Sequence, residues 1–333
     1  MTNAASGSPK LSVHEAQRQA AETVKQALMG APNPICEITN HLAGAQGKGV
    51  RTLLLLYTAM DADGLVPVDT VKAAAAVELF HMATLVHDDV IDNAPLRRGI
   101  PTVQYKFGRK HAVICGDYLL CLAASFAVPL HSDYREHADL LQVFTSALSR
   151  ICMGELRQLC NNRNIELEIP GYLRIISEKT AALFYVAAFA GALIARYNRD
   201  ETMRLARFGR YFGMVFQIVD DCKDYEISED EALKTVGKDI SEGVVTLPLI
   251  YAFRNSPQLR DMAKEAFDDA ILAKQLAKAV CNTDGTQKSR DLAVRYADKA
   301  RLLLKTFPDY KTGSLLELLS KSIGVTGIFK KTN

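Results

Sequence analysis

The segment from Asp69 to Asp92 constrains the fold more than any other part of the sequence. Most of its residues are Ala, Val, Leu, Ile, Phe or Met, and no helix breaker occurs before Pro95. Asp69 is a good N-cap residue, so the segment predicts a helix about 36 Å long. Because this helix is apolar around nearly its whole circumference, we expect other elements to bury it on every side.

The last turn of this helix carries three carboxylates, Asp88, Asp89 and Asp92, in the pattern DDxxD. The helix macrodipole already disfavours negative charge at that end. Asp88 and Asp92 are spaced i,i+4 and therefore project from one face. Such a cluster has to be protonated, paired or bound to a cation.

The rest of the chain is dominated by helical periodicity. Further helices are predicted at 11–30, 34–41, 51–62, 110–131, 135–163, 171–198, 200–225, 247–255, 258–282, 286–306 and 312–323. The one strand-like alternation, Ile165–Ile169, is short and stops at Pro170. We therefore predict an all-α fold, one large helical bundle that spans 1–333 as a single domain, with 1–10 as a disordered tail.

Composition excludes several classes of function. A net charge of +2 indicates neither a nucleic-acid-binding surface nor a polybasic membrane patch. The N-terminus is polar, which argues against a signal peptide, and the apolar run Ala181–Ala195 is too short to span a bilayer. Seven scattered cysteines without a CxxC pair are typical of reduced core residues. These features predict a cytoplasmic protein without a membrane span.

A second DDxxD, formed by Asp220, Asp221 and Asp224, closes the helix predicted at 200–225. A single acidic cluster more often lies on the solvated surface than in a cation site. Two clusters with the same spacing, each at the end of a buried-looking helix, favour a site for hard divalent cations if they face each other. Mg²⁺ is usually bound by one or two carboxylates, with water and substrate phosphates completing the octahedron.

The sequence also supplies candidate phosphate ligands. Arginine forks fit phosphate oxygens bidentately, and a glycine-rich loop lets a ligand approach the backbone closely. Each basic residue taken alone is more often a surface charge, but their grouping around the acidic clusters predicts a phosphorylated ligand. These residues are Lys48 and Arg51 in a glycine-rich loop, Arg97 and Arg98 after the first cluster, and Lys179 and Lys238 on either side of the second.

From about Gly47 to Pro248 the chain resembles the trans-isoprenyl diphosphate synthase (polyprenyl synthetase) family. His81–Asp92 reads HxxxLxHDDxxD and is followed by Arg97-Arg98-Gly99, and Phe216–Asp224 reads FQxxDDxxD. Shorter matches are Gly116-Asp117, Lys179-Thr180-Ala181, Gly237-Lys238-Asp239 and Thr246-Leu247-Pro248. The resemblance implies a helical fold around a deep central cavity, and head-to-tail condensation of isopentenyl diphosphate onto an allylic diphosphate such as geranyl or farnesyl diphosphate.

The resemblance also implies roles for individual residues. It assigns Asp88, Asp92, Asp220 and Asp224 to Mg²⁺, with three ions when substrate is bound. It assigns the allylic diphosphate to Arg97, Lys179 and Lys238, and the isopentenyl diphosphate pocket to Lys48, Arg51, His81 and Arg98. Thr180 and Gln217 resemble the polar groups that face the allylic cation. His87 is interpreted as a core histidine. The resemblance further implies a homodimer.

The sequence departs from the family pattern at two places. Gln46 and Thr52 replace the Gly and Pro that often flank the Lys48–Arg51 motif, and we expect little effect. Val244 stands where many members have a lysine, so one diphosphate contact of those members is missing, as it is in some longer-chain members.

Product length is expected to depend on the helix that ends at Asp88. Short-chain members block the path of the growing chain with aromatic residues at positions that are Ala83 and Thr84 here, both small. Phe80 lies one turn further down, and Phe144 from another helix is a second candidate for the floor. The resemblance favours a medium or long product, from hexaprenyl to octaprenyl, similar to heptaprenyl or octaprenyl diphosphate synthases and suited to a respiratory quinone.

Three alternatives stay open at this point. The chain could be a geranylgeranyl diphosphate synthase, or a catalytic subunit that needs a small regulatory partner. A class I terpene cyclase is disfavoured, because its second metal site usually reads Asn/Asp, Ser/Thr, Glu, and it has less use for an isopentenyl diphosphate pocket.

Overall fold

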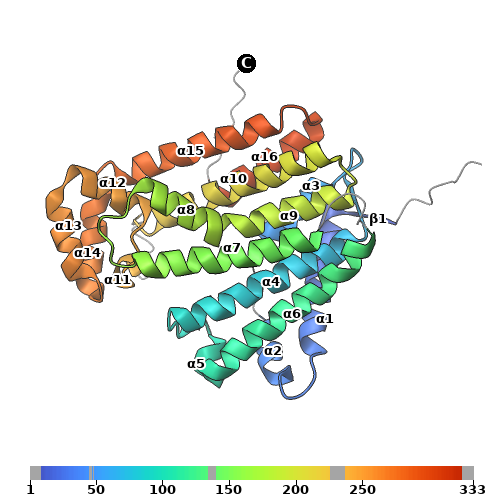
Figure 1. Cartoon of the computed structure of the whole chain (residues 1–333), viewed down its shortest axis with the longest axis horizontal. Coiled ribbons are helices and arrows are strands. Elements are labelled where there is room, and N and C mark those ends of the chain that lie inside the picture. Colours follow the sequence, from blue (N-terminus) through green and yellow to red (C-terminus); the bar gives the residue numbers. More distant parts are fainter. Residues whose placement is uncertain (1–8, 45–46, 48, 134–139, 226–236, 325–333) are drawn as a thin grey trace, which may run out of the picture. The chain divides into compact units, whose positions relative to one another are not determined.

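The computed structural model describes residues 9–44, 47, 49–133, 140–225 and 237–324, and within them the fold is helical, as predicted (Figure 1). The strands in these residues form two small antiparallel sheets. β1 (Lys10–Ser12) pairs with β2 (Leu65–Pro67), and β3 (Leu96–Arg97) pairs with β4 (Ile100–Pro101). Lys10, which the sequence placed in a disordered tail, lies opposite Pro67 in the first of these sheets.

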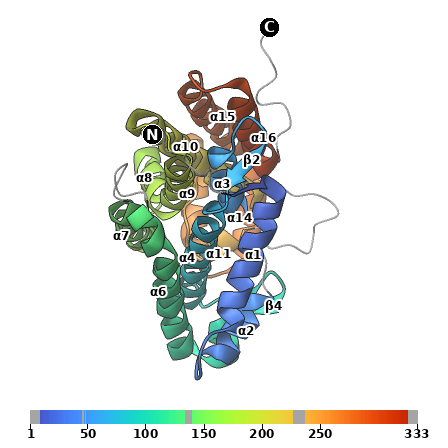
Figure 2. The ribbon, with the colours of Figure 1, turned by 90° about the vertical axis from the view of Figure 1, so that its right-hand side faces the viewer.

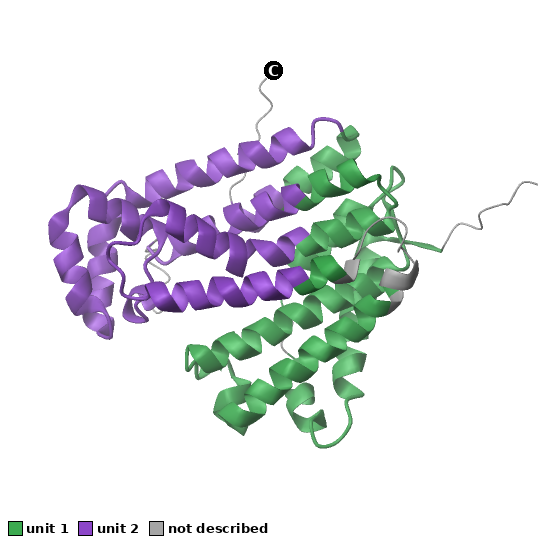
Figure 3. Cartoon of the chain, viewed as in Figure 1, with its two compact units in different colours: residues 1–145, 186–206, 307–318 green, residues 146–185, 207–306, 319–333 purple. Residues whose placement is uncertain are grey.

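The chain divides into two compact units, each built from separate stretches (Figure 3). Unit 1 contains residues 1–145, 186–206 and 307–318, and unit 2 contains 146–185, 207–306 and 319–333. The boundary between them falls inside α7 (Leu140–Asn161), α9 (Ala181–Ile194), α10 (Arg199–Lys223) and α16 (Asp309–Ile323). The single domain expected from the sequence stays a prediction.

Unit 1 is organised around α4 (Thr70–Ile91), the apolar helix. It contacts α1 (Val13–Met29), α3 (Val50–Ala59), α5 (Val103–Phe107) and α6 (Arg109–Asp133), and Figure 2 shows it between α1 and α6. The short α2 (Cys36–Ala43) packs on α1 and α5. Ala74, Ala75 and Leu79 are completely buried, so the expected all-round burial of α4 is confirmed. Its small side chains let neighbouring helices approach closely, as at Gly116 of α6, which lies against His87.

In unit 2, α12 (Leu247–Asn255) contacts α8 (Ile169–Lys179), α13 (Pro257–Ala266), α14 (Ala270–Cys281) and α15 (Gly285–Leu303). The short α11 (Lys238–Ser241) packs on α13 and α14.

Two predicted helices are each divided in the structure. The helix predicted at 171–198 is interrupted at Thr180, and the one predicted at 258–282 ends at Ala266 and restarts at Ala270. Asp269 starts the second half of the latter, because its side chain accepts hydrogen bonds from the amides of Ile271 and Leu272. Apolar periodicity continues across both breaks, which is why the sequence predicted single helices.

One stretch of α6, Arg109–Val128, is long and apolar enough to cross a bilayer by length and composition. The sequence analysis overlooked this, since it considered only the run Ala181–Ala195. The core helix of a folded protein passes the same test, and α6 packs along α4 in unit 1. Its outer side nevertheless leaves Val113 and Ile114 exposed.

A buried lysine closes the C-terminal end of α3. Lys311 of α16 is completely buried, and its Nζ donates hydrogen bonds to the carbonyl oxygens of Tyr57 (3.2 Å), Thr58 (2.8 Å) and Met60. Burial lowers the pKa of Lys311 to about 7, and in its ammonium form the three N–H bonds meet three carbonyls at the negative end of a helix. The Tyr197 ring lies 5.5 Å from the same Nζ.

We predict that Lys311→Met lowers the free energy of unfolding by about 2–4 kcal/mol, because three buried carbonyls lose their donor. Urea denaturation followed by circular dichroism measures this loss. Lys305→Met, at an exposed position nearby, should stay within about 0.5 kcal/mol of wild type. Equal losses in the two variants would contradict this role for Lys311.

Candidate active site

The first acidic cluster separates its three carboxylates by burial. Asp89 is only 6% exposed, and its Oδ1 accepts a hydrogen bond from Nε of Arg97 at 2.7 Å. Asp88 is partly exposed and Asp92 exposed, so both outer carboxylates of the i,i+4 pair reach the surface. Sequence reasoning did not foresee the Asp89–Arg97 pair, which fixes an arginine that the resemblance assigns to the allylic diphosphate.

Arg97 and Arg98 are placed by the β3–β4 hairpin. Arg98 and Gly99 both have positive φ, 52° and 81°, which makes a tight turn between the two strands. The preceding loop is tied down by Thr102, whose hydroxyl donates to the carbonyl of Ala94 at 2.7 Å. Gly47 lies so close to Arg98 that a Cβ there would be 2.8 Å from the arginine Nη1.

Arg51 and His81 contact each other, with Nη1 of Arg51 3.1 Å from Nε2 of His81. Because arginine always donates, Nε2 of His81 has to accept, and the ring proton lies on Nδ1. Burial lowers the pKa of His81 well below 6.5, and the positive charges of Arg51, Arg98 and Arg97 lower it further. His81 is therefore neutral, and only its Nδ1–H can donate to a ligand.

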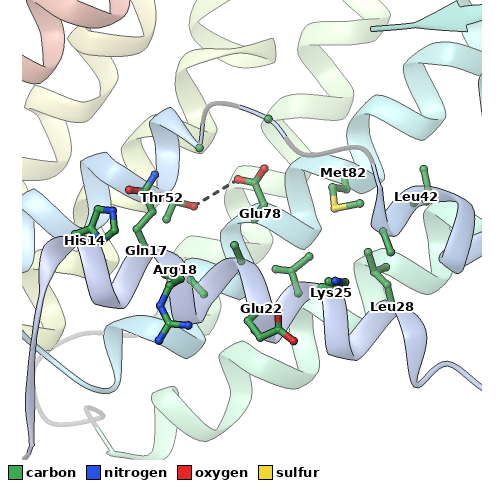
Figure 4. Close-up of a pocket in the computed structure, with 16 residues that line it drawn as sticks. His14, Gln17, Arg18, Glu22, Lys25, Leu28, Leu42, Thr52, Glu78 and Met82 are labelled. Carbon is green, nitrogen blue, oxygen red and sulfur yellow. Dashed lines mark hydrogen bonds between the residues drawn. The ribbon is translucent and has the colours of Figure 1, made fainter. Parts of the chain in front are cut away.

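Glu78 lies one turn before His81 on α4. Burial raises the pKa of its carboxyl group, and Arg51 and Arg98 partly offset this rise. The hydroxyl of Thr52 donates to Glu78 at 3.4 Å, and both side chains line a cavity of about 400 Å³ that also reaches α1 (Figure 4). Sequence reasoning assigned Glu78 no role, although the charges of Arg51 and Arg98, two of the predicted diphosphate ligands, act on its carboxyl group.

Unit 1 thus places Arg51, His81 and Arg98 near one another, as expected for one anion-binding pocket. Lys48, the fourth residue predicted for this pocket, lies outside the described residues. His87 packs against Gly116 of α6, and its Nε2 lies 3.4 Å from a carboxylate oxygen of Asp117, but its side chain is 29% exposed, so it is not the core histidine that the sequence predicted.

In unit 2, Lys179 ends α8 and pairs with Glu155 of α7 at 2.5 Å. The two helices come close at Gly154, where a Cβ would lie 2.3 Å from the backbone nitrogen of Lys179. Lys238 lies 3.4 Å from Glu242. Both lysines therefore have a carboxylate partner.

The second acidic cluster repeats the arrangement of the first. Asp221 is 6% exposed, whereas Asp220 is exposed and 3.0 Å from Lys223. Asp224 is half-buried and accepts a hydrogen bond from the backbone amide of Asp239 at 3.3 Å. The buried middle aspartate and the two more open outer ones are thus common to both motifs.

Negative charge is crowded around this second cluster. Burial raises the pKa of Asp224, raises that of Asp239 well above its ordinary value and raises that of Asp221 to about 7, and the neighbouring carboxylates add to each rise. Crowded hard oxygen donors of this kind fit a divalent cation. The sequence quoted Asp239 in a motif but gave it no role.

No group of three His, Cys, Asp or Glu side chains in the described part of the chain is arranged to hold a metal by itself. A cation here would need oxygens from water or substrate as well, which is how Mg²⁺ is usually held.

Thr180 and Gln217 belong to a hydrogen-bond chain in unit 2 that is partly exposed at these two residues and buried at Asp221. The Thr180 hydroxyl donates to Oε1 of Gln217 at 2.8 Å, and Nε2 of Gln217 donates to Oδ1 of Asp221 at 2.7 Å. The hydroxyl of Tyr172 donates to the other oxygen of Asp221 at 2.6 Å. Sequence reasoning found the first two residues and missed Tyr172, which carries no motif signal.

The two candidates for the floor of the product tunnel are in contact. The rings of Phe80 and Phe144 meet edge-to-face with centroids 5.1 Å apart, and both are buried in unit 1. Ala83, one turn above Phe80 on α4, is completely buried. The sequence left open which of the two phenylalanines forms the floor. In the structure the two rings form one aromatic pair.

Comparison with known proteins decides the family. The family model described as Polyprenyl synthetase matches residues 32–282, which is most of the chain. The chain belongs to the polyprenyl synthetase family. The resemblance stated from the sequence motifs is thereby confirmed.

Several relatives of this family are similar over nearly their whole length. Heptaprenyl diphosphate synthase component 2 of Geobacillus stearothermophilus is 35% identical over 91% of this chain and 93% of its own length. The crystal structure of heptaprenyl diphosphate synthase from Staphylococcus aureus superposes with a TM-score of 0.85 at 28% identity, covering 95% of this chain and 99% of that one. A Caulobacter crescentus polyprenyl synthase, solved with calcium and isoprenyl diphosphate, gives a TM-score of 0.82 at 30% identity over 93% and 95% of the two chains.

The lowered pKa of His81 predicts a pH effect on stability. As pH falls below 6.5, the unfolded chain takes up a proton at His81 that the folded chain does not, so wild type loses stability. Between pH 7 and pH 5 wild type should lose about 2 kcal/mol more than His81→Gln, which lacks this group. Urea titrations at the two pH values measure the difference, and His14→Gln, at an exposed histidine, is the control. Parallel losses in wild type and His81→Gln would contradict the buried neutral state.

Proposed function

We propose that the chain is a prenyltransferase that condenses isopentenyl diphosphate head-to-tail onto an allylic diphosphate, geranyl or farnesyl diphosphate. The observation that carries this proposal is common to both DDxxD motifs: the middle aspartate differs from the two outer ones in burial and in hydrogen-bond partners. In each, the middle aspartate is buried and hydrogen-bonded inward, to Arg97 or to Gln217 and Tyr172. The outer pair, Asp88 with Asp92 and Asp220 with Asp224, is more exposed than the middle aspartate.

Each group of residues has a task in this reaction. Asp88, Asp92, Asp220 and Asp224 would hold Mg²⁺, for which we propose three ions, and the metal supplies positive charge that stabilises the diphosphate as it leaves. Arg97, Lys179 and Lys238 bind the allylic diphosphate; Lys48, Arg51, His81 and Arg98 bind isopentenyl diphosphate.

The proposed condensation breaks one carbon–oxygen bond and forms one carbon–carbon bond. The allylic C1–O bond breaks, and its electron pair leaves with diphosphate. The double bond of isopentenyl diphosphate then attacks C1, and a proton lost from its C2 goes to the departing diphosphate. Thr180 and Gln217 present oxygen atoms to the allylic cation, so no nucleophilic Ser or Cys is required.

A partner-dependent form is the second candidate. The Geobacillus stearothermophilus relative is named component 2 of its synthase, which suggests a small regulatory subunit for this chain as well. Purified chain, Mg²⁺, farnesyl diphosphate and labelled isopentenyl diphosphate test both forms. Incorporation by the chain alone supports the simple synthase, activity only with a second protein supports the two-component form, and a cyclic hydrocarbon would indicate a terpene cyclase.

We further propose that the chain forms a homodimer in the cytoplasm, with the apolar outer side of α6 covered by a second copy and not by lipid. Val113 and Ile114 are 41% and 63% exposed, and Val128 of the same helix is 51% exposed. Ile114→Asp should give monomers by light scattering where wild type gives dimers, because a charge would be buried in the interface. Monomeric wild type, or wild type that sediments with membranes, would contradict this proposal.

The Phe80–Phe144 pair predicts how product length will respond to substitution. We expect a medium or long product, from hexaprenyl to octaprenyl. Ala83→Phe should shorten it sharply by narrowing the path above the pair, and Phe80→Ala should lengthen it by removing the floor. Chromatography of the dephosphorylated products measures chain length.

Phe208→Ala, which removes an equally buried ring in unit 2, is the control and should leave length unchanged. A wild-type product that stops at C15 would contradict the medium or long assignment, and one that stops at C20 would indicate a geranylgeranyl diphosphate synthase.

A further inference from the structure

The hydrogen-bond chain from Tyr172 to Thr180 runs in one direction. Each of the two oxygens of the Asp221 carboxylate accepts one hydrogen bond. The Tyr172 hydroxyl supplies one donor and the NH₂ of Gln217 supplies the other. The carbonyl oxygen of Gln217 is then turned toward Thr180, and the Thr180 hydroxyl has to donate to it.

This direction determines what Gln217 and Thr180 offer to a ligand. The hydroxyl proton of Thr180 is used in the bond to Gln217, so the outward side of this hydroxyl presents lone pairs only. The amide oxygen of Gln217 likewise keeps its second lone pair. Two oxygen atoms without a free proton form a surface that stabilises positive charge, provided that their orientation is fixed before the charge develops.

Without Asp221 and Tyr172 the amide of Gln217 would have no reason to prefer this orientation. An amide turned by 180° would present its NH₂ toward Thr180 and free the Thr180 proton, and the same two residues would then repel a cation. Asp221 itself is buried, so it acts on the ligand only through the group that it orients.

We propose that Asp221 and Tyr172 are positioning residues for the allylic cation, which hold the Gln217 amide and the Thr180 hydroxyl with their lone pairs toward the reacting carbon. This inference rests on the proposed prenyl transfer. It gives the middle aspartate of the second motif a task separate from metal binding. Tyr172, which is buried on α8, needs no contact with substrate or metal for this task.

Tyr172→Phe tests the proposal without altering any carboxylate. Single-turnover condensation of farnesyl diphosphate with labelled isopentenyl diphosphate should slow by about tenfold, with the KM values of both substrates and the Mg²⁺ activation curve unchanged. A binding measurement separates positioning from folding. The affinity for an allylic diphosphate analogue with a protonated amine in place of the cationic carbon should fall by about tenfold relative to its neutral carbon isostere.

A double-mutant cycle asks whether Tyr172 acts through Gln217. In a Gln217→Ala background, Tyr172→Phe should change the rate by less than about twofold, because the group that it orients is gone. The matched control is Tyr225→Phe, which also removes a buried hydroxyl, one 2.7 Å from Oγ1 of Thr246. Tyr225→Phe should lower thermal stability about as much as Tyr172→Phe does. It should leave the ratio between the affinities for the charged and the neutral analogue at the wild-type value.

Two results would overturn the inference while the proposed function stands. One is an active Tyr172→Phe with a wild-type rate and a wild-type affinity ratio; the other is rate losses that multiply in the double variant. Wild-type chain that incorporates no isopentenyl diphosphate, alone or with a second protein, would instead overturn the proposed function, and this inference with it.

Discussion

The burial of α4 is the constraint on which the rest of unit 1 depends. A helix apolar on every side has to be surrounded, and α1, α3, α5 and α6 pack around it. Its polar residues are consequently confined to one end and to a few positions such as Glu78 and His81. Each of these has a partner: Thr52 for Glu78, Arg51 for His81, and Arg97 for Asp89 at the C-terminal turn. The packing that buries α4 therefore also holds the polar side chains of the site in place.

In unit 2, too, the buried polar groups of the site have partners. The middle aspartate of its motif is buried, and its two oxygens are both used, one by Tyr172 and one by Gln217. Burying an acid is unfavourable unless hydrogen bonds compensate, so these donors make the buried position tolerable. Lys179 likewise has a partner, because it forms an ion pair with Glu155 where α7 and α8 approach each other at Gly154.

Sequence reasoning found what is encoded locally. The long helices and both DDxxD motifs follow from periodicity and spacing, and the family from the motifs. The breaks at Thr180 and before Asp269 were missed, because apolar residues continue through both. Partners such as Asp89 with Arg97, or Lys311 with the end of α3, depend on tertiary contacts that no spacing rule describes. Lys311 in particular reads in the sequence as an ordinary surface lysine, yet it is completely buried.

The place of Lys311 in the chain has a consequence for synthesis. Unit 1 joins segments that are far apart in the sequence, because its α3 obtains its buried lysine cap from residue 311, more than 250 residues later. This contact cannot form until residue 311 has been synthesised. The C-terminal end of α3 therefore lacks this cap until then, although α1, α3, α5 and α6, which cover α4, have all been synthesised much earlier.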